Sequence, residues 1–558
     1  MGMAARSRPP REHALSTVAR TSTATHRVAA DQLVLLVLAA LLIVAGATRR
    51  EFFGDGVRHL PAILSERIQP GEPRWLLFPP LANLWIRLLS GLGVVAHGES
   101  ALRALVVLSV ASGILLLVAL RVWLRSECGD DSRRAAALLL AGSCGPFLIL
   151  FSDVAEPQLA AAIAVAGLAY ARCWRDDPDR GARAAFCAVV AIALASLIYQ
   201  GVILALGMLP LVVPTTTITR RRLGLASGVA ILVVMATMMA SELWKGAPVS
   251  AAATAVVRGE RNPLMRSMMA TTSPLKYVAA LVAGPPQGII PLNNYAGLRA
   301  LTSSLDINAV LLLLGGIVMA ALVVRGVRDR QWSVLTAVAI LLALPVIRNQ
   351  QYAYVKFYVL WPIPVALLAL GWRSRTIFAA AAVVLAANSW VLTEQVRHGR
   401  ENYAHARSTY ASATSSTCWF TSGWTPPFAY LWPGTAAPVL GTLATGSEPD
   451  LQRRALTGSL RRCFCDSDAV WTDTTTRDAD VLTAIAVHFD YRGIDWASML
   501  IEPQKANGTT APDVWVYSAT SRGRACLATQ GRSDRGQTGV RRGSDWGQTG
   551  VRPRPSQF

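Results

Sequence analysis

A short charged loop holds the residue whose type and setting best suit chemistry. Residues 33–48 are uncharged and apolar, and the segment Arg49–His59 follows them at once. Within this segment Asp55 stands between two glycines, and Arg58 comes three residues later. This arrangement leaves the carboxylate free to meet a ligand near a membrane surface, where partial desolvation raises its basicity. The alternative is a plain turn, because Gly-Asp-Gly is ordinary turn chemistry.

Two other clusters place ionisable or phenolic groups at the ends of apolar runs. Asp153 and Glu156 flank a tight turn, and the segment 348–358 carries a cluster of cations and phenols that includes Arg348, Tyr354 and Lys356. Ionisable groups at membrane depth are costly, so they are candidates for function. The three clusters are complementary, with acids on two loops and cations on a third.

Each cluster also has a structural alternative. Asp153 caps a helix that starts near residue 157, with Glu156 in its first turn. In the structural alternative, Tyr354 belongs to an aromatic belt at the membrane interface. Lys356 then extends its aliphatic chain along apolar surface so that its ammonium group reaches the same interface. Arg58 pairs with a nearby glutamate.

The composition predicts a polytopic membrane protein. Of the 558 residues, 53 % are hydrophobic and 16 % are charged, a balance that is unusual for a large soluble core. The formal net charge of +20 would suggest nucleic acid as a partner in a soluble protein. Here the arginines stand mostly in short gaps between apolar runs, where orientation in a membrane accounts for them, so no nucleic-acid partner is expected.

The apolar runs predict about eleven transmembrane helices, each close to the ~20 residues that a bilayer needs. They cover 33–48, 101–124, 134–151, 156–173, 183–199, 200–214, 223–243, 307–324, 332–347, 355–372 and 376–393. The region 183–214 is either one long helix or two short ones that meet at Tyr199-Gln200-Gly201, and we prefer two, because ~31 residues is too long for one tilted span. Basic loops alternate with less basic ones, which places the N-terminus in the cytoplasm and the C-terminus outside.

These runs divide the chain into four parts. Residues 1–32 are predicted to be a disordered cytoplasmic tail, and 33–393 to be an all-α transmembrane domain. Its first outer loop, 49–100, contains an interrupted apolar stretch from 76 to 96 that suits a helix lying in the interface. Residues 394–530 are predicted to form a small extracytoplasmic α/β or α+β domain with one or two disulfides, and 531–558 a disordered basic tail.

The order of these features resembles the GT-C superfamily of polyprenyl-phosphate-sugar-dependent membrane glycosyltransferases. The shared layout is an acid soon after the first helix, a long outer loop with interface helices, an acidic second outer turn, a late Tyr/Lys/Arg cluster before a proline-containing span, and a C-terminal outer domain. The resemblance covers most of residues 30–395. Two positions depart from it: Gly56 follows Asp55 where many relatives carry a second acid, and Tyr199-Gln200 stands where relatives often have a lysine.

The resemblance implies roles for the candidate residues. Asp55 matches the general base that deprotonates the acceptor hydroxyl, which then attacks the anomeric carbon of a lipid-phosphate sugar with inversion. The residues expected to bind the donor phosphate are Arg58, Arg348, Tyr354 and Lys356. Some family members use a divalent metal such as Mg or Mn, and its matching ligands are Asp153 and Glu156.

The resulting expectation is an inverting hexosyl- or pentosyltransferase in a bacterial plasma membrane. Its donor is a polyprenyl-phosphate sugar, and its acceptor is a glycan, lipid or protein of the cell envelope. Two alternatives stay open. A multi-pass transporter would show broken helices near the bilayer midplane and an internal repeat, and an envelope scaffold without enzymatic activity would not need Asp55.

Overall fold

The structure, a computed structural model, describes most of the helical part of the chain. It covers residues 29–49, 73–95, 98–154, 157–177, 180–213, 217–258, 307–347 and 359–411. Positions 63–64, 68, 70–71, 286 and 288–290 are also described, as are five short strands beyond residue 411. Six of the described helices are long and apolar enough to cross a membrane. The chain is thus a mostly helical integral membrane protein, as its composition predicts.

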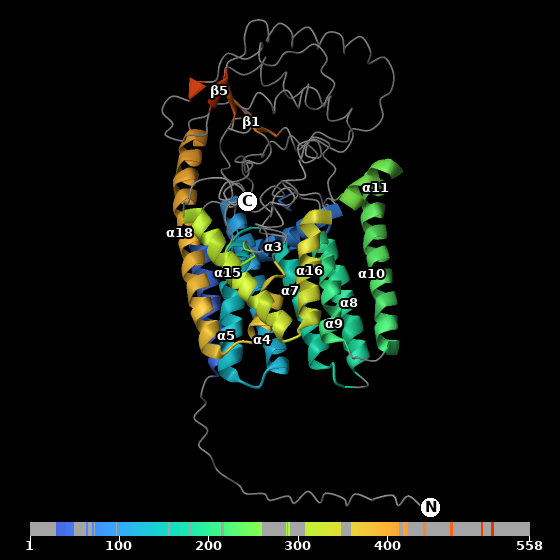
Figure 1. Cartoon of the computed structure of the whole chain (residues 1–558). Helices are drawn as coiled ribbons and strands as arrows, with labels where there is room; N and C mark the ends of the chain where they lie inside the picture. The colour runs from blue at the N-terminus through green and yellow to red at the C-terminus, as the bar shows by residue number, and fades with distance from the viewer. Residues whose placement is uncertain are drawn as a thin grey trace, which may run out of the picture.

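The helices stand side by side as a bundle (Figure 1). In chain order they are α1 (Ala30–Thr48), η2 (Pro73–Trp75), α3 (Phe78–Gly91), α4 (Gly98–Glu127), α5 (Asp131–Ser143), α6 (Gly145–Leu150), α7 (Pro157–Cys173), α8 (Gly181–Ile198), η3 (Gln200–Met208), α9 (Leu209–Val212), α10 (Thr217–Trp244), α11 (Val249–Arg258), α15 (Ile307–Arg328), α16 (Trp332–Ile347), α17 (Pro362–Ala369) and α18 (Ser374–Ala411).

Small residues let the central helices approach closely. α4 packs on α7, α7 packs on α8, and α5 lies between α1 and α18. A side chain on Gly167 of α7 would meet the Cβ of Ala191 in α8 at 2.7 Å. Between helices in lipid, where hydrophobic burial gives no drive, such close contacts supply the packing energy.

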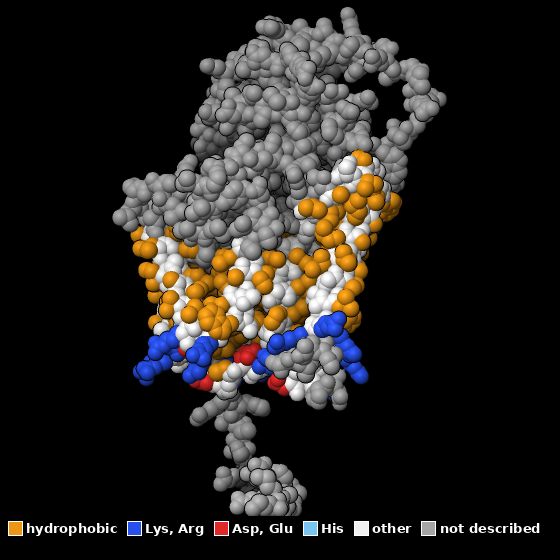
Figure 2. Space-filling model, turned by 45° about the vertical axis from the view of Figure 1, so that its right-hand side comes forward, with side chains coloured by type: hydrophobic (Ala, Val, Ile, Leu, Met, Phe, Trp, Pro, Cys, Tyr) orange, Lys and Arg blue, Asp and Glu red, His pale blue; other side chains and the backbone are white. Residues whose placement is uncertain are grey.

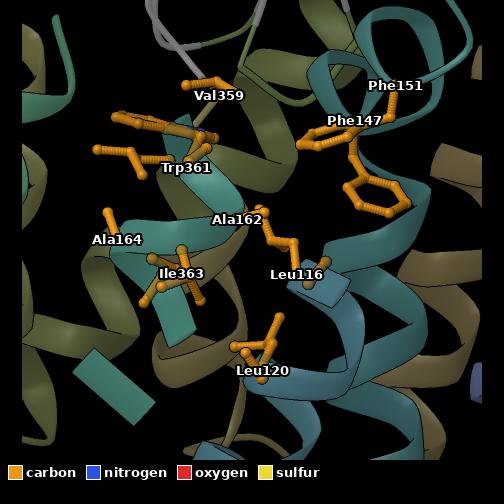
Figure 3. Packing of buried hydrophobic residues seen from close by; sticks show 14 of the residues in the cluster. Leu116, Leu120, Phe147, Phe151, Ala162, Ala164, Val359, Trp361 and Ile363 are labelled. Atoms are coloured by element: carbon orange, nitrogen blue, oxygen red, sulfur yellow. The ribbon is translucent and has the colours of Figure 1, made fainter. Parts of the chain in front are cut away.

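Larger side chains fill the space around this small-residue interface. Figure 3 shows Leu116 and Leu120 of α4, Phe147 and Phe151 of the α6 region and Trp361 at the start of α17 pointing into one buried cluster. The two phenylalanine rings are tilted, with centroids 4.9 Å apart. The cluster therefore joins the early helices to α17, more than 200 positions further along the chain.

Among the described residues, a band of Lys and Arg side chains lies at one end of the bundle. Figure 2 shows the Lys and Arg side chains as a band at the lower edge of a hydrophobic surface. The contacts agree, because Asp31 at the start of α1 pairs with Arg121 and Arg125 near the end of α4 and with Arg134 at the start of α5. We call this the arginine-rich end, and the other the opposite end.

The region 183–214 forms two segments, as preferred from the sequence. α8 stops at Ile198, and Tyr199 takes an extended conformation before the 3₁₀ helix η3 begins. The second segment returns to the arginine-rich end, where Arg175, just after α7, donates a hydrogen bond of 3.1 Å to the carbonyl oxygen of Leu211.

The predicted span 134–151 is broken in two. α5 ends at Ser143, Cys144 is extended, and α6 starts at Gly145. The physical reason is Pro146, which lacks the N–H that an unbroken helix needs. Asn388 of α18 bridges the break, donating to the carbonyl oxygens of Ser143 at 2.7 Å and Ile289 at 2.9 Å.

The interrupted apolar stretch 76–96 forms a short helix at the opposite end. Leu77, just before α3, donates its backbone N–H to Leu197 near the end of α8. Trp85 of α3 donates to the carbonyl oxygen of Ala104 near the start of α4. With 14 residues α3 is too short to cross a bilayer, and these contacts place it across the ends of two spans.

α18 leads from the bundle toward a small sheet (Figure 1). Its 38 residues make it about 57 Å long, so it extends well beyond a ~30 Å hydrocarbon core. The strands β1 (Thr417–Thr421), β2 (Val439–Gly441), β3 (Ala469–Thr472), β4 (Gln504–Lys505) and β5 (Trp515–Tyr517) pair in the order β2-β1-β3-β5-β4. β1 pairs in parallel with β2 and β3, and β5 pairs antiparallel with β3 and β4.

Candidate functional site

Most of the predicted site residues lie outside the described residues. These are Asp55, Arg58, Glu156, Arg348, Tyr354 and Lys356. Asp153 is described, and so is Arg49, the residue from which the loop carrying Asp55 departs. The structure therefore describes Asp153 and the residues around the start of the first loop, at the opposite end of the bundle.

Arg49 is a buried cation at the end of α1. Its side chain is 1 % exposed although it follows directly on an apolar helix. Its Nη1 atom donates to the carbonyl oxygen of Ile149 at 2.8 Å and to Ser152 Oγ at 2.9 Å. Ile149 lies in the last turn of α6, where a helix leaves its carbonyl groups without partners of its own. Arg49 therefore caps the C-terminal end of α6, and α1 ends at the same residue.

The acid that faces Arg49 is Asp153. Arg49 Nη2 lies 3.7 Å from Asp153 Oδ2, and Asp153 is 2 % exposed. The other carboxylate oxygen, Oδ1, accepts the backbone N–H of Val154 at 2.6 Å. A buried charge is strongly unfavourable unless it is paired and hydrogen-bonded, and each partner here meets that need for the other.

A second arginine holds the backbone of the same turn. Arg103, near the start of α4, donates to the carbonyl oxygen of Arg49 at 2.8 Å. It also approaches the carbonyl oxygen of Ala47 at 3.4 Å. Because a cation at a helix C-terminus is favourable, Arg103 stabilises the end of α1. Three elements, α1, α4 and the α6–α7 turn, thus meet where the first loop begins.

The predicted metal site, Asp153 with Glu156, stays a prediction, because Glu156 lies outside the described residues. The Asp153 carboxylate is already engaged by Arg49 and by the N–H of Val154. In the described part of the chain, no group of three or more His, Cys, Asp or Glu side chains converges as metal ligands would. We derive no step through a metal ion.

An analogous cluster at the arginine-rich end escaped the sequence analysis. Asp31 is 1 % exposed and lies within 3.0 to 3.8 Å of Arg121, Arg125 and Arg134. The sequence places Asp31 in the predicted tail 1–32, but α1 begins at Ala30. The three arginines offset the cost of burying the charge of Asp31 in the first turn of this helix. Buried ion pairs thus hold both ends of α1, at Asp31 and at Arg49.

Local patterns held little signal for these residues. Arg49 was predicted to be the first residue of a charged loop, yet it is buried in an ion pair. Asn388 lies within the predicted span 376–393 and was not singled out, yet it is fully buried. The one usable signal was a charge or amide directly next to a long apolar run, which is costly without a partner.

A scan of protein-family models gives no match, and a search of curated proteins gives none either. Solved structures similar to this chain include the Archaeoglobus fulgidus oligosaccharyltransferase tethered with an acceptor peptide, at 11 % identity and TM-score 0.46, over 88 % of this chain and 74 % of that chain. ArnT from Cupriavidus metallidurans bound to undecaprenyl phosphate is similar at 14 % identity and TM-score 0.42, over 88 % and 98 % of the two chains. The archaeal enzyme in complex with Zn and sulfate is similar at 12 % identity and TM-score 0.41, over 87 % and 73 %.

Proposed function

We propose that this chain is an inverting membrane glycosyltransferase that moves a sugar from a polyprenyl-phosphate donor to an acceptor at the outer face of the membrane. The observation that supports it is the Arg49–Asp153 pair, which joins the start of the loop carrying Asp55 to the second acidic turn. Two loops far apart in sequence therefore leave the bundle from one point, as the layout inferred from the sequence requires.

In the proposed reaction Asp55 is the general base. Its carboxylate accepts the proton of an acceptor hydroxyl while that oxygen attacks the anomeric carbon. The bond from the anomeric carbon to the phosphate oxygen breaks on the opposite face, so the configuration inverts and the polyprenyl phosphate leaves with the bonding electrons. The growing charge on that phosphate needs cations and hydrogen-bond donors, roles that we assign to Arg58, Arg348, Tyr354 and Lys356.

The proposed partners are a lipid donor and an envelope acceptor. The donor belongs to the same class of lipid phosphate as the undecaprenyl phosphate in the ArnT structure. The acceptor, a glycan, lipid or protein, is left open by the residues on which the proposal rests. A divalent metal plays no part in the steps above.

The proposed orientation follows from charge. Positive residues are enriched in cytoplasmic loops, so we assign the arginine-rich end to the cytoplasm and the opposite end, with Arg49 and Asp153, to the outside. α18 then leads outward to the C-terminal part, and we assign the four cysteines of that part to an oxidising compartment.

The test is sugar transfer by the purified protein in liposomes. With a labelled polyprenyl-phosphate sugar and envelope extract as acceptor, we expect label to move to the acceptor in a protein-dependent way, and no transfer from the matching nucleotide sugar. Transfer from the nucleotide sugar in the absence of any lipid donor would contradict the proposal.

A transporter is the second candidate, favoured by the break between α5 and α6. Discontinuous helices are typical of substrate sites in transporters, and Cys144 lies at such a discontinuity. The same liposomes decide between the two functions. A transporter accumulates the labelled sugar lipid or its head group inside sealed vesicles without changing it, whereas the proposed enzyme releases polyprenyl phosphate.

A further inference from the structure

The acid of the second outer turn has a partner that its sequence position did not suggest. We propose that the Arg49–Asp153 ion pair is a positioning device: it fixes the first residue of the outer loop on the α6–α7 turn, and Asp153 serves Arg49 rather than a metal ion. The proposal rests on the proposed function, because it is the loop with Asp55 that the pair would position.

The contacts of Arg49 carry the first step. One guanidinium spans three groups of the α6–α7 region: the carbonyl oxygen of Ile149, the hydroxyl of Ser152 and the carboxylate of Asp153. A planar guanidinium loses little freedom for each hydrogen bond that it forms, which makes arginine suited to such a link. The side chain is therefore held at several points, and the backbone at residue 49 is held with it.

Arg103 supplies the second step, because it fixes the main chain independently of that side chain. Its hydrogen bond to the carbonyl oxygen of Arg49 sets the direction in which the chain leaves α1. Arg49 is itself extended, with φ −69° and ψ 137°, so the helix ends there and the loop begins. Backbone and side chain of one residue are thus anchored to two different helices.

Chain length gives the consequence for Asp55. Six residues separate it from Arg49, and a fully extended chain spans about 3.3–3.6 Å per residue. Asp55 therefore lies within about 20 Å of the anchored residue. If α1 frays at its end, the loop gains length and the position of the base becomes less defined, which lowers the rate of a reaction that depends on near-attack geometry.

Burial explains why this link needs both partners. Removing one member of a buried ion pair leaves an uncompensated charge, whereas removing both is often close to neutral. If Asp153 were instead a metal ligand, the effect of replacing it would not depend on whether Arg49 is present. The two roles of Asp153 are therefore separated by a double-mutant cycle.

The first arm of the test measures stability and does not need activity. Arg49→Met and Asp153→Asn should each lower the apparent melting temperature of the purified protein, and the double variant should fall no further than the worse single one. Arg397→Met, which removes an exposed pair with Glu394, is the matched control and should leave it unchanged. Additive losses in the double variant would overturn the proposal.

The second arm follows the loop directly by hydrogen–deuterium exchange. Arg49→Met should speed exchange in peptides covering residues 50–62, Arg49→Lys should do so less, and Asp55→Asn should not. Unchanged exchange in Arg49→Met would show that the pair does not position the loop, whatever the outcome for transfer activity.

The third arm measures transfer kinetics. Arg49→Met and Asp153→Asn should each lower kcat about 10- to 100-fold with a smaller change in KM, because position rather than binding is lost. A metal ligand predicts another pattern, in which Asp153→Asn raises the concentration of Mn²⁺ or Mg²⁺ needed for half-maximal activity and Arg49→Met does not. That pattern would overturn the assignment of Asp153. If Asp55→Asn loses activity and the losses of stability in the Arg49/Asp153 double-mutant cycle are not additive, both proposals are supported. Full activity of Asp55→Asn removes the base assignment alone.

Discussion

Replacement of Asn388 by leucine tests how the broken helix is held together. Asn388 is fully buried in α18 and donates one hydrogen bond to Ser143, at the end of α5, and one to Ile289. Leucine has the same number and branching of side-chain heavy atoms but no donor, so both bonds are lost while the shape of the side chain is roughly kept. The same carbonyl of Ile289 also accepts the N–H of Gly145, at the start of α6.

The expected loss of stability follows from these contacts. Hydrogen bonds between helices in a membrane contribute about 0.6 kcal/mol on average and up to ~1.7, so two give about 1–3 kcal/mol. Ile289 keeps the Gly145 N–H, but the Ser143 carbonyl at the helix end loses a donor, which adds about 1 kcal/mol. Leucine gains little from burial, because lipid is as apolar as the protein interior. We expect the free energy of unfolding to fall by about 2–4 kcal/mol.

The assay is unfolding of the purified protein in mixed micelles with increasing SDS, followed by tryptophan fluorescence. Thr393→Val is the matched control, because it removes an exposed hydrogen bond within the same helix. We expect the control to change the unfolding free energy by less than about 0.5 kcal/mol. If Asn388→Leu behaves like the control, the amide does not hold the α5–α6 break and the reasoning is refuted.

Three further predictions concern packing, orientation and disulfides. Gly167→Leu should lower the melting temperature, because even a Cβ there lies 2.7 Å from Ala191 and overpacking costs about 1–3 kcal/mol. Gly224→Leu, with no atom within 4 Å of the new Cβ, should not, and equal losses would contradict the close α7–α8 contact. Exposed Cys173 at the arginine-rich end should react with an impermeant maleimide in inside-out vesicles only, and labelling from outside intact cells would reverse the orientation. Peptide mapping without reductant should find one or two disulfides in the C-terminal part, and four free thiols would place that part in a reducing compartment. The cysteines involved are Cys418, Cys463, Cys465 and Cys526.

Much of the helical architecture follows from local sequence patterns. Long apolar runs marked the spans that α4 and α10 form, and Tyr199-Gln200 marked the point where the chain stops being one helix. Within the C-terminal part predicted to be α/β or α+β, Trp515–Tyr517 form the strand β5. These features depend on hydrophobic length and on nearby breakers, which a single sequence displays.

The buried contacts of Asp31 and Arg49 did not follow from such patterns. Asp31 meets Arg121 across 90 positions, and Arg49 meets Ser152 across 103. Pairing over such distances is decided by helix packing, so a charge beside an apolar run reads as a loop residue until the partner helix is known. The break at Cys144 has a local cause in Pro146, but distant residues satisfy the groups that it frees. Asn388 donates to the carbonyl oxygen of Ser143, and the carbonyl oxygen of Ile289 accepts the N–H of Gly145.

The central claim is tested most directly by comparing wild-type protein with Asp55→Asn in the transfer assay. Asp176→Asn, an exposed acid at the arginine-rich end, is the matched control, and all three proteins are compared at equal expression and equal melting temperature. We predict that wild type and the control move sugar from the polyprenyl-phosphate donor to the acceptor and that Asp55→Asn loses at least about 100-fold of this activity. Full transfer by Asp55→Asn would contradict the account.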